Sequence, residues 1–229
     1  MTQGIKSETI TLTAADGATL SAYKVGPAAA PRGGIVVIQE IFGVNGHIRN
    51  VADGFARNGY LAVAPALYDR LSPGTELGYT ADDMQPALDL RAKSDPAKAL
   101  LDIAAAVQVA SAAGPVGVVG YCWGGYLSWL SAAKVSGVSA AVVYYGGGIG
   151  SAAQEEPRCP VLGHFGERDK HIPILDVQGL AKRYPERVEI HIYAADHGFN
   201  CDERASYDAA STAHALERTL AFFGSHLRG

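Results

Sequence analysis

The spacing of hydrophobic residues changes character near residue 34. Before that point, residues 8–14 and 18–25 alternate apolar with polar positions and are joined by an Asp-Gly turn, which predicts an antiparallel hairpin at the edge of a sheet. After it, continuous apolar runs typical of strands buried on both faces alternate with segments of helical spacing. The runs that predict strands are 33–43, 60–67, 115–121, 138–146, 159–166 and 187–195. The segments that predict helices are 47–59, the stretch from Pro96 onward, 123–134, 173–184 and 207–227.

This alternation predicts an α/β fold, with a mostly parallel central sheet, helices on both faces and the N-terminal antiparallel hairpin. We find no internal repeat and no linker, so residues 1–229 are expected to form a single domain. Residues 66–95 are the only place where an insertion could cover the sheet. Ligands of such folds bind at the carboxyl ends of the strands, so the residues that follow each strand are the candidates for function.

Composition excludes several classes of partner. The chain is 48% hydrophobic, carries a formal net charge of −4 and has no cluster of Lys or Arg, which argues against nucleic acid or an anionic membrane. The N-terminus lacks a signal-peptide core and no segment reaches transmembrane length, so we expect a cytoplasmic protein, either a monomer or a small homo-oligomer. Three scattered cysteines do not form a disulfide framework; they are Cys122, Cys159 and Cys201.

The segment Gly120-Tyr121-Cys122-Trp123-Gly124 has the pattern Gly-x-nucleophile-x-Gly between a predicted strand and a predicted helix. A sharp turn there would strain the backbone of Cys122 and expose its thiol at a helix N-terminus, which favours the thiolate. The N–H of Trp123 would be placed to bind an oxyanion. The same pattern also fits a small buried cysteine in a tight turn, and the motif alone does not decide between the two.

Two further strand ends supply the partners of a triad. Asp169 follows the strand predicted at 159–166, and His197 follows the strand predicted at 187–195. The chain order nucleophile, acid, histidine is that of an α/β-hydrolase, and the spacings leave room for one strand–helix passage each. Three independent strand ends with the right residue types predict a Cys122–His197–Asp169 triad.

Other residues compete for these roles. Asp196 is adjacent to His197, and neighbouring side chains diverge too far for it to orient that ring. His171 could pair locally with Asp169, and a metal site of Asp169, His171 and His197 is conceivable, but no metal-ligand motif supports it. Solvated or structural roles are expected for His47, His214 and His226 on helices, for Cys159 at a strand start and for Cys201 in a loop.

From about residue 33 onward the chain resembles the dienelactone hydrolases (carboxymethylenebutenolidases) of the α/β-hydrolase superfamily. The resemblance rests on segments such as "QEIFG", "APALYDRLSPGT", "GYCWGG" and "HFGERDKHIP". It implies the Cys122–His197–Asp169 triad, an oxyanion hole from the backbone of Ile41 and Trp123, and a role for Glu40 beside the thiol. It implies no metal and no cofactor.

The family acts on a small planar lactone whose carboxylate is held by arginines. Arg70 matches one of them, whereas the position expected for the second is Cys201, and Arg204 lies three residues further on. We also expect Phe42 and Tyr145 to line the substrate site. The resemblance therefore implies a small ester or lactone that carries a negative charge.

The expected chemistry is attack of the Cys122 thiolate on an ester carbonyl, an acyl-thioester, and hydrolysis by water activated by His197. A carboxylate at Glu40 would disfavour the thiolate and keep the resting thiol neutral; the alternative for Glu40 is a salt bridge with Arg70 or Arg204. A related thioesterase or acyltransferase remains open, as does a non-catalytic, redox-sensing protein on the same scaffold.

Overall fold

A computed structural model describes residues 4–228. In this part of the chain, eight strands form one sheet in the order β1-β2-β4-β3-β5-β6-β7-β8. β1 pairs with β2 and β2 with β4 in antiparallel fashion, and all other neighbours are parallel, as the sequence predicts. The strands are β1 (Ile5–Thr13), β2 (Thr19–Pro27), β3 (Gly34–Ile38), β4 (Leu61–Pro65), β5 (Val116–Tyr121), β6 (Val138–Tyr144), β7 (Val161–Gly166) and β8 (Val188–Tyr193).

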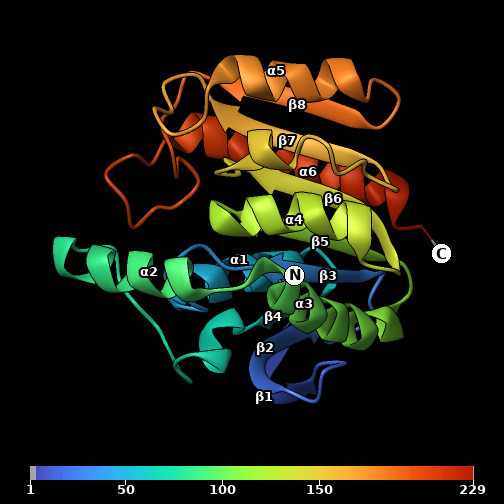
Figure 1. The fold of residues 1–229 in the computed structure, drawn as a ribbon. Helices are drawn as coiled ribbons and strands as arrows, with labels where there is room; N and C mark the ends of the chain where they lie inside the picture. The colour runs from blue at the N-terminus through green and yellow to red at the C-terminus, as the bar shows by residue number, and fades with distance from the viewer. Residues whose placement is uncertain (1–3, 229) are drawn as a thin grey trace.

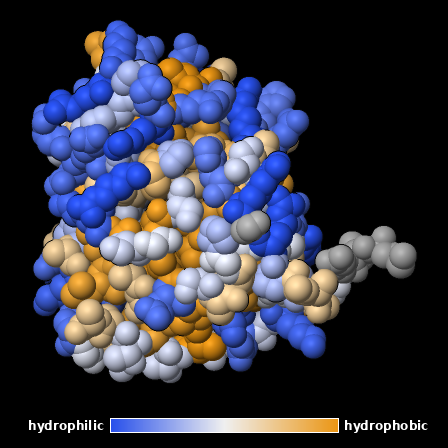
Figure 2. All heavy atoms as spheres, turned by 90° about the vertical axis from the view of Figure 1, so that its right-hand side faces the viewer, coloured by the Kyte–Doolittle hydropathy of each residue, from blue (hydrophilic) through white to orange (hydrophobic). Residues whose placement is uncertain are grey.

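Helices cover both faces of the sheet (Figure 1). α1 (Gly46–Arg57) and α6 (Ala209–His226) lie on one face, and α3 (Pro96–Ala110), α4 (Trp123–Lys134) and α5 (Ile174–Arg183) lie on the other. The described residues also include the short 3-10 helices η1 (Leu67–Arg70), η2 (Ser111–Ala113) and η3 (Ile149–Ala152). Figure 2 shows the end of the molecule opposite α2 in Figure 1, where hydrophobic side chains run between two hydrophilic flanks, as a sheet enclosed by two helical layers requires.

The core lies on both faces of the central strands. Every residue of β3, β5 and β7 is buried, which explains why these strands read as continuous apolar runs and not as alternating ones. The helix after β5 begins at Trp123, one residue past Cys122, and Asp95 caps α3 by accepting from the N–H of Ala97. The strand–helix junctions that carry the candidate residues are therefore anchored in buried structure.

One helix was not predicted. α2 (Ala81–Lys93) begins with a capping box between Thr80 and Asp83, but only Ala87 of the helix is buried and Pro86 lies inside it. Without a buried face, the helix leaves no clear hydrophobic period in the sequence. In Figure 1, α2 extends toward the same side of the molecule as the loop between β8 and α6. Helix α2 lies within residues 66–95, the segment in which the sequence predicted that an insertion could cover the sheet.

The expectation about transmembrane length needs one correction. The stretch Pro96–Ala113 is long and apolar enough for a membrane span, with a mean hydropathy of 1.2. In the structure most of this stretch is α3, which packs against β3, β4 and α4. Its apolar character is accounted for by its position in the helical layer beside the sheet.

Candidate active site

Cys122 occupies the strained corner that its motif predicts. Its φ of 54° and ψ of −115° are unusual for a residue with a side chain, and its N–H donates to the carbonyl of Tyr144 at 3.0 Å. A Cβ on Gly120 would collide with the carbonyl oxygen of Gly124, and a Cβ on Gly124 would collide with the carbonyls of Ile38 and Gln39. Strand and helix thus approach so closely that only glycine fits on either side of the cysteine, which lies at the N-cap of α4.

The histidine and the aspartate come together from two separate strand ends. Nδ1 of His197 lies 2.7 Å from Oδ2 of Asp169, whose carboxylate is almost fully buried. The other oxygen of Asp169 accepts from the backbone N–H of His171 at 2.8 Å. Asp196 instead faces Arg168 on the surface at 3.7 Å, so it does not orient the ring of His197. His171 supports Asp169 through its backbone, and its own ring packs edge-on to that of His197.

The environment of His197 favours the protonated ring. Burial alone would lower its pKa, but the hydrogen bond to Asp169 and the interaction with Cys122 outweigh burial and raise the pKa to about 10. A protonated imidazole beside the sulfur stabilises a thiolate, and the ring is oriented by Asp169 through one defined nitrogen. This arrangement is suited to nucleophilic attack by sulfur followed by proton transfer from the ring.

Cys122 and His197 open into one cavity of about 440 Å³. Ile41, Phe42 and Trp123 line it from the sheet side, and Met84, Leu88 and Arg91 line it from α2. Met84 and Leu88 are large apolar side chains that remain exposed to solvent. The cavity is therefore mainly apolar, with cationic groups from Arg91 and Arg204 at its edges.

The two backbone amides expected to form an oxyanion hole belong to residues of this cavity. Within residues 4–228, neither the N–H of Ile41 nor that of Trp123 donates a hydrogen bond. Trp123 is the first residue of α4, where the helix dipole adds positive potential. Both amides are thus free to donate to a developing oxyanion.

Glu40 is fully buried at the end of β3 and is held by polar partners. The hydroxyl of Tyr79 donates to its Oε2 at 2.8 Å, and Arg204 lies 3.5 Å from its Oε1. The salt bridge considered for Glu40 is thus formed with Arg204. Burial, followed by the charge of Glu40, raises the pKa of Tyr79, so that hydroxyl remains a donor.

The structure does not bring Arg70 to this site, and the prediction that it binds substrate is corrected. Its guanidinium lies between Asp16 and Asp102, at 2.8 Å and 2.7 Å, and Arg70 is not among the residues that line the cavity of Cys122. Asp102 is fully buried and needs this partner, because an unpaired buried carboxylate is costly. The match in sequence therefore reflects a structural ion pair and not a substrate contact.

The cation that sequence reasoning missed is Arg91, whose guanidinium lies 5.1 Å from the ring centroid of Trp123. The sequence does contain a weak indication of the helix that carries Arg91. The capping box at Thr80 is followed by Met84, Leu88 and Arg91 at spacings of four and three, which place them on one helix face. The helix has almost no buried positions, so its sequence shows no hydrophobic period that would predict the helix or the face that lines the cavity.

Of the two aromatic residues expected to line the substrate site, Phe42 lines the cavity and Tyr145 does not. Phe42 lines the cavity and packs against Tyr79 at 4.6 Å between ring centroids. Tyr145 is fully buried with a φ of 37°, and its ring packs edge-on to His197 at 5.2 Å. Tyr145 therefore supports the back of the histidine ring rather than lining the open cavity.

The sheet order, the strained residue between β5 and α4, and an acid and a histidine after β7 and β8 define the α/β-hydrolase class. The chain belongs to the dienelactone hydrolase family, whose model matches residues 20–227. It is a hydrolase of the dienelactone hydrolase type.

Individual relatives agree with this assignment. The carboxymethylenebutenolidase of Pseudomonas putida is 37% identical over 227 residues, which cover 94% of this chain and 95% of that protein. A crystal structure from Klebsiella pneumoniae, provisionally named a dienelactone hydrolase, is 32% identical with a TM-score of 0.86, covering 96% of this chain and 99% of that one. An esterase from Pyrococcus furiosus shares the fold alone, with a TM-score of 0.72 at 14% identity and coverage of 97% and 93%.

Proposed function

We propose that this protein hydrolyses a small lactone or ester that carries a carboxylate, through a Cys122–His197–Asp169 triad and an acyl-thioester intermediate. The single observation that carries the proposal is the arrangement at Cys122: a strained cysteine at a helix N-terminus that shares a cavity with a histidine bound to a buried aspartate at 2.7 Å. The name of the P. putida relative points to the same class of substrate.

The proposed reaction begins when the Cys122 thiolate attacks the carbonyl carbon of the lactone. The carbonyl electron pair moves onto oxygen, where the N–H groups of Ile41 and Trp123 stabilise it. Collapse of this intermediate breaks the C–O bond of the ring, and the imidazolium of His197 gives its proton to the leaving alkoxide. The neutral ring then deprotonates a water molecule, which hydrolyses the thioester and restores the thiolate–imidazolium pair.

The selectivity for an anion is assigned to Arg91 and Arg204. Both line the cavity beside Cys122, and guanidinium matches a carboxylate in two-point contact. Arg204 already forms an ion pair with Glu40, whereas Arg91 has no ion pair within residues 4–228. A carboxylate on the substrate would therefore gain most of its binding free energy from contact with Arg91.

Glu40 is assigned a restraining role on the resting thiol. A buried carboxylate at the end of β3 adds negative potential to the site, and Tyr79 and Arg204 hold it in place. An incoming anion that binds Arg204 would compete with Glu40 for the guanidinium, so substrate binding and the position of this carboxylate are coupled.

The test is a panel of small lactones and aryl esters, each with and without a carboxylate, assayed with the wild type and four variants. We expect Cys122→Ala to lose turnover of every substrate. Arg91→Met and Arg204→Met should raise KM for the carboxylate-bearing substrates by roughly tenfold to a hundredfold, since a contact to a charged group contributes about 1.5–3 kcal/mol. Arg57→Met, an exposed change on α1, is the matched control and should leave all kinetics unchanged.

Two outcomes would refute the proposal. Full turnover in Cys122→Ala would remove the thiol from the reaction. Equal kinetics on charged and neutral substrates in the wild type, unaltered by either arginine variant, would leave a thiol esterase but eliminate the anionic substrate. A saturable preference for thioesters over the oxyester panel would favour the related thioesterase activity instead.

A further inference from the structure

Three side chains of types that bind metal ions lie close to one another near the active site. The proposed reaction assigns a role to only one of them, Glu40. The three are Glu40 at the end of β3, His47 in the first turn of α1 and Cys201 in the loop after β8. One donor atom from each lies within 4.8 Å of the other two, and all three residues are buried. The expectation of a solvated helix face for His47 is therefore corrected, because His47 is buried. Cys201 lies in a loop, as expected, and is fully buried there.

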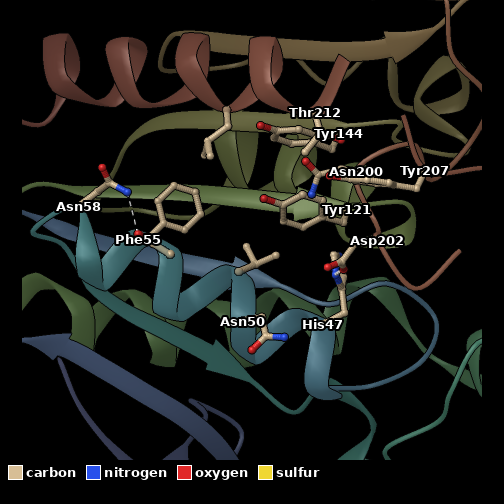
Figure 3. A pocket seen from close by; sticks show the side chains of 13 residues that line it. His47, Asn50, Phe55, Asn58, Tyr121, Tyr144, Asn200, Asp202, Tyr207 and Thr212 are labelled. Carbon is tan, nitrogen blue, oxygen red and sulfur yellow. Dashed lines mark hydrogen bonds and ion pairs between the residues drawn. The ribbon is translucent and has the colours of Figure 1, made fainter. Parts of the chain in front are cut away.

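His47 is oriented as a ligand would be. Its Nδ1 faces the carboxylate of Asp202 at 3.5 Å, as Figure 3 shows. Its Nε2, on the other side of the ring, is buried and has no hydrogen-bond partner in the part of the chain that the structure describes. A buried nitrogen without a partner is unfavourable, so it calls for a ligand that this chain does not itself supply. A carboxylate on one ring nitrogen is the usual support for a histidine that binds metal through the other.

The other two donors also have capacity to bind. Glu40 accepts from Tyr79 and pairs at a distance with Arg204, but a carboxylate has about four lone-pair directions, and these contacts leave some of them open. Cys201 is a free, fully buried cysteine. A thiolate, an imidazole and a carboxylate are together the donors that zinc accepts, whereas magnesium and calcium prefer oxygen alone.

We propose that Glu40, His47 and Cys201 form a binding site for one zinc ion, with a water molecule in the fourth position. Zinc bonds of about 2.0–2.3 Å place tetrahedral donors roughly 3.5 Å apart. Donor atoms that lie up to 4.8 Å apart therefore need to draw together by about 1.3 Å or less. Binding involves no redox step. The thiol of Cys201 releases one proton to solvent, and the hydrated ion exchanges water for the three protein donors.

A second cavity borders the proposed site at His47. This cavity of about 310 Å³ lies between α1, α6 and the loop after β8, and His47 forms part of its wall with Tyr121, Asn200 and Asp202 (Figure 3). The polar groups of this wall suit a hydrated cation, and Asp202 adds a negative charge at the point where the cavity meets the imidazole. The cavity thus borders the proposed site at the His47 ring, while Glu40 and Cys201 are not among its lining residues.

The experiment measures metal binding and not turnover, so it stands independently of the proposed function. Cys122 and His197 form a second thiol–imidazole pair that could bind zinc, so all measurements use the Cys122→Ala background. Metal-free protein is titrated with Co²⁺ alone as a spectroscopic probe and then with Zn²⁺ in competition. We expect one equivalent of Co²⁺ with the absorption of a single thiolate-to-cobalt bond, displaced by one equivalent of Zn²⁺.

Substitutions in that background locate the site. Cys201→Ala and His47→Gln should abolish the thiolate–cobalt absorption and weaken zinc binding by more than a hundredfold. Cys159→Ala, the matched change at the other buried thiol, should leave both intact. Asp202→Asn should weaken zinc binding by roughly tenfold to a hundredfold, the usual effect of removing an outer carboxylate. Circular dichroism establishes whether each variant is folded. If His47→Gln does not fold, the zinc and cobalt binding of Cys201→Ala alone tests the site. Absence of stoichiometric binding in the background protein, or its survival in Cys201→Ala, would overturn the proposal.

Discussion

The hydrogen bond between Asp169 and His197 sets the charge of the histidine, and Asp169→Asn measures how strongly. The bond is 2.7 Å long and its acceptor is almost fully buried, so solvent screens it little. A hydrogen bond to a charged group contributes about 1.5–3 kcal/mol, and about 1.4 kcal/mol corresponds to a change of one in pKa. We therefore expect the pKa of His197 to fall by about 1 to 2 from its raised value of about 10.

The assay is an NMR titration of the imidazole signals, in which His197 is recognised by the signal that His197→Gln removes. Asp196→Asn is the matched control, because this carboxylate is adjacent in sequence but faces Arg168 on the surface. Turnover of Asp169→Asn should also fall on the order of a thousandfold or more, since the amide favours the wrong ring tautomer. An unchanged titration midpoint, or equal shifts in the two variants, would refute the role given to Asp169.

The same pKa predicts how stability depends on pH. Folding raises the pKa of His197 from an ordinary value of 6.5 to about 10, so the protonated ring favours the folded state. This contribution is fully present below about 6.5 and is lost as the pH rises through about 10. In Asp169→Asn the loss should be complete at a lower pH. Urea unfolding at a series of pH values tests the sign, and stability that rises with pH from this group would contradict it.

The remaining predictions concern substitutions at four residues. Cys122→Ser should retain the fold but lose most turnover, because a hydroxyl is far less acidic than a thiol; near-normal rates would show that the thiolate is unnecessary. Glu40→Gln should speed alkylation of Cys122 at neutral pH if the carboxylate restrains the thiol, whereas slower alkylation would mean that Glu40 assists deprotonation. Arg70→Met should lower the free energy of unfolding by about 3–5 kcal/mol by leaving buried Asp102 unpaired, with KM unchanged in whatever protein remains folded; a stable variant with a raised KM would restore Arg70 to the substrate site. Gly120→Ala should prevent normal folding, because its Cβ collides with backbone; a melting temperature equal to that of the wild type would disprove the close strand–helix approach.

The sequence by itself determined the strands, the helices that pack on them and the residues at the strand ends. Apolar runs such as 115–121 must be buried, and the chain order of Cys122, Asp169 and His197 then places all three at one edge of a parallel sheet. The glycines at 120 and 124 predicted the sharp corner, since only a close strand–helix approach requires both. These features are local or follow from hydrophobic periodicity, which is why sequence reasoning reached them.

Only the tertiary structure decided which charged and polar groups meet. Arg70 was drawn to buried Asp102, 32 residues away, and Arg204 to Glu40, 164 residues away, and nothing in the local pattern selects such partners. α2 has almost no buried face, so its contribution of Arg91 to the cavity left no period to detect. His47 and Cys201 looked like a surface helix residue and a loop residue until the fold placed them together beside Glu40. Periodicity reports whether a segment is buried, whereas the pairing of side chains depends on distances between segments that only the folded chain sets.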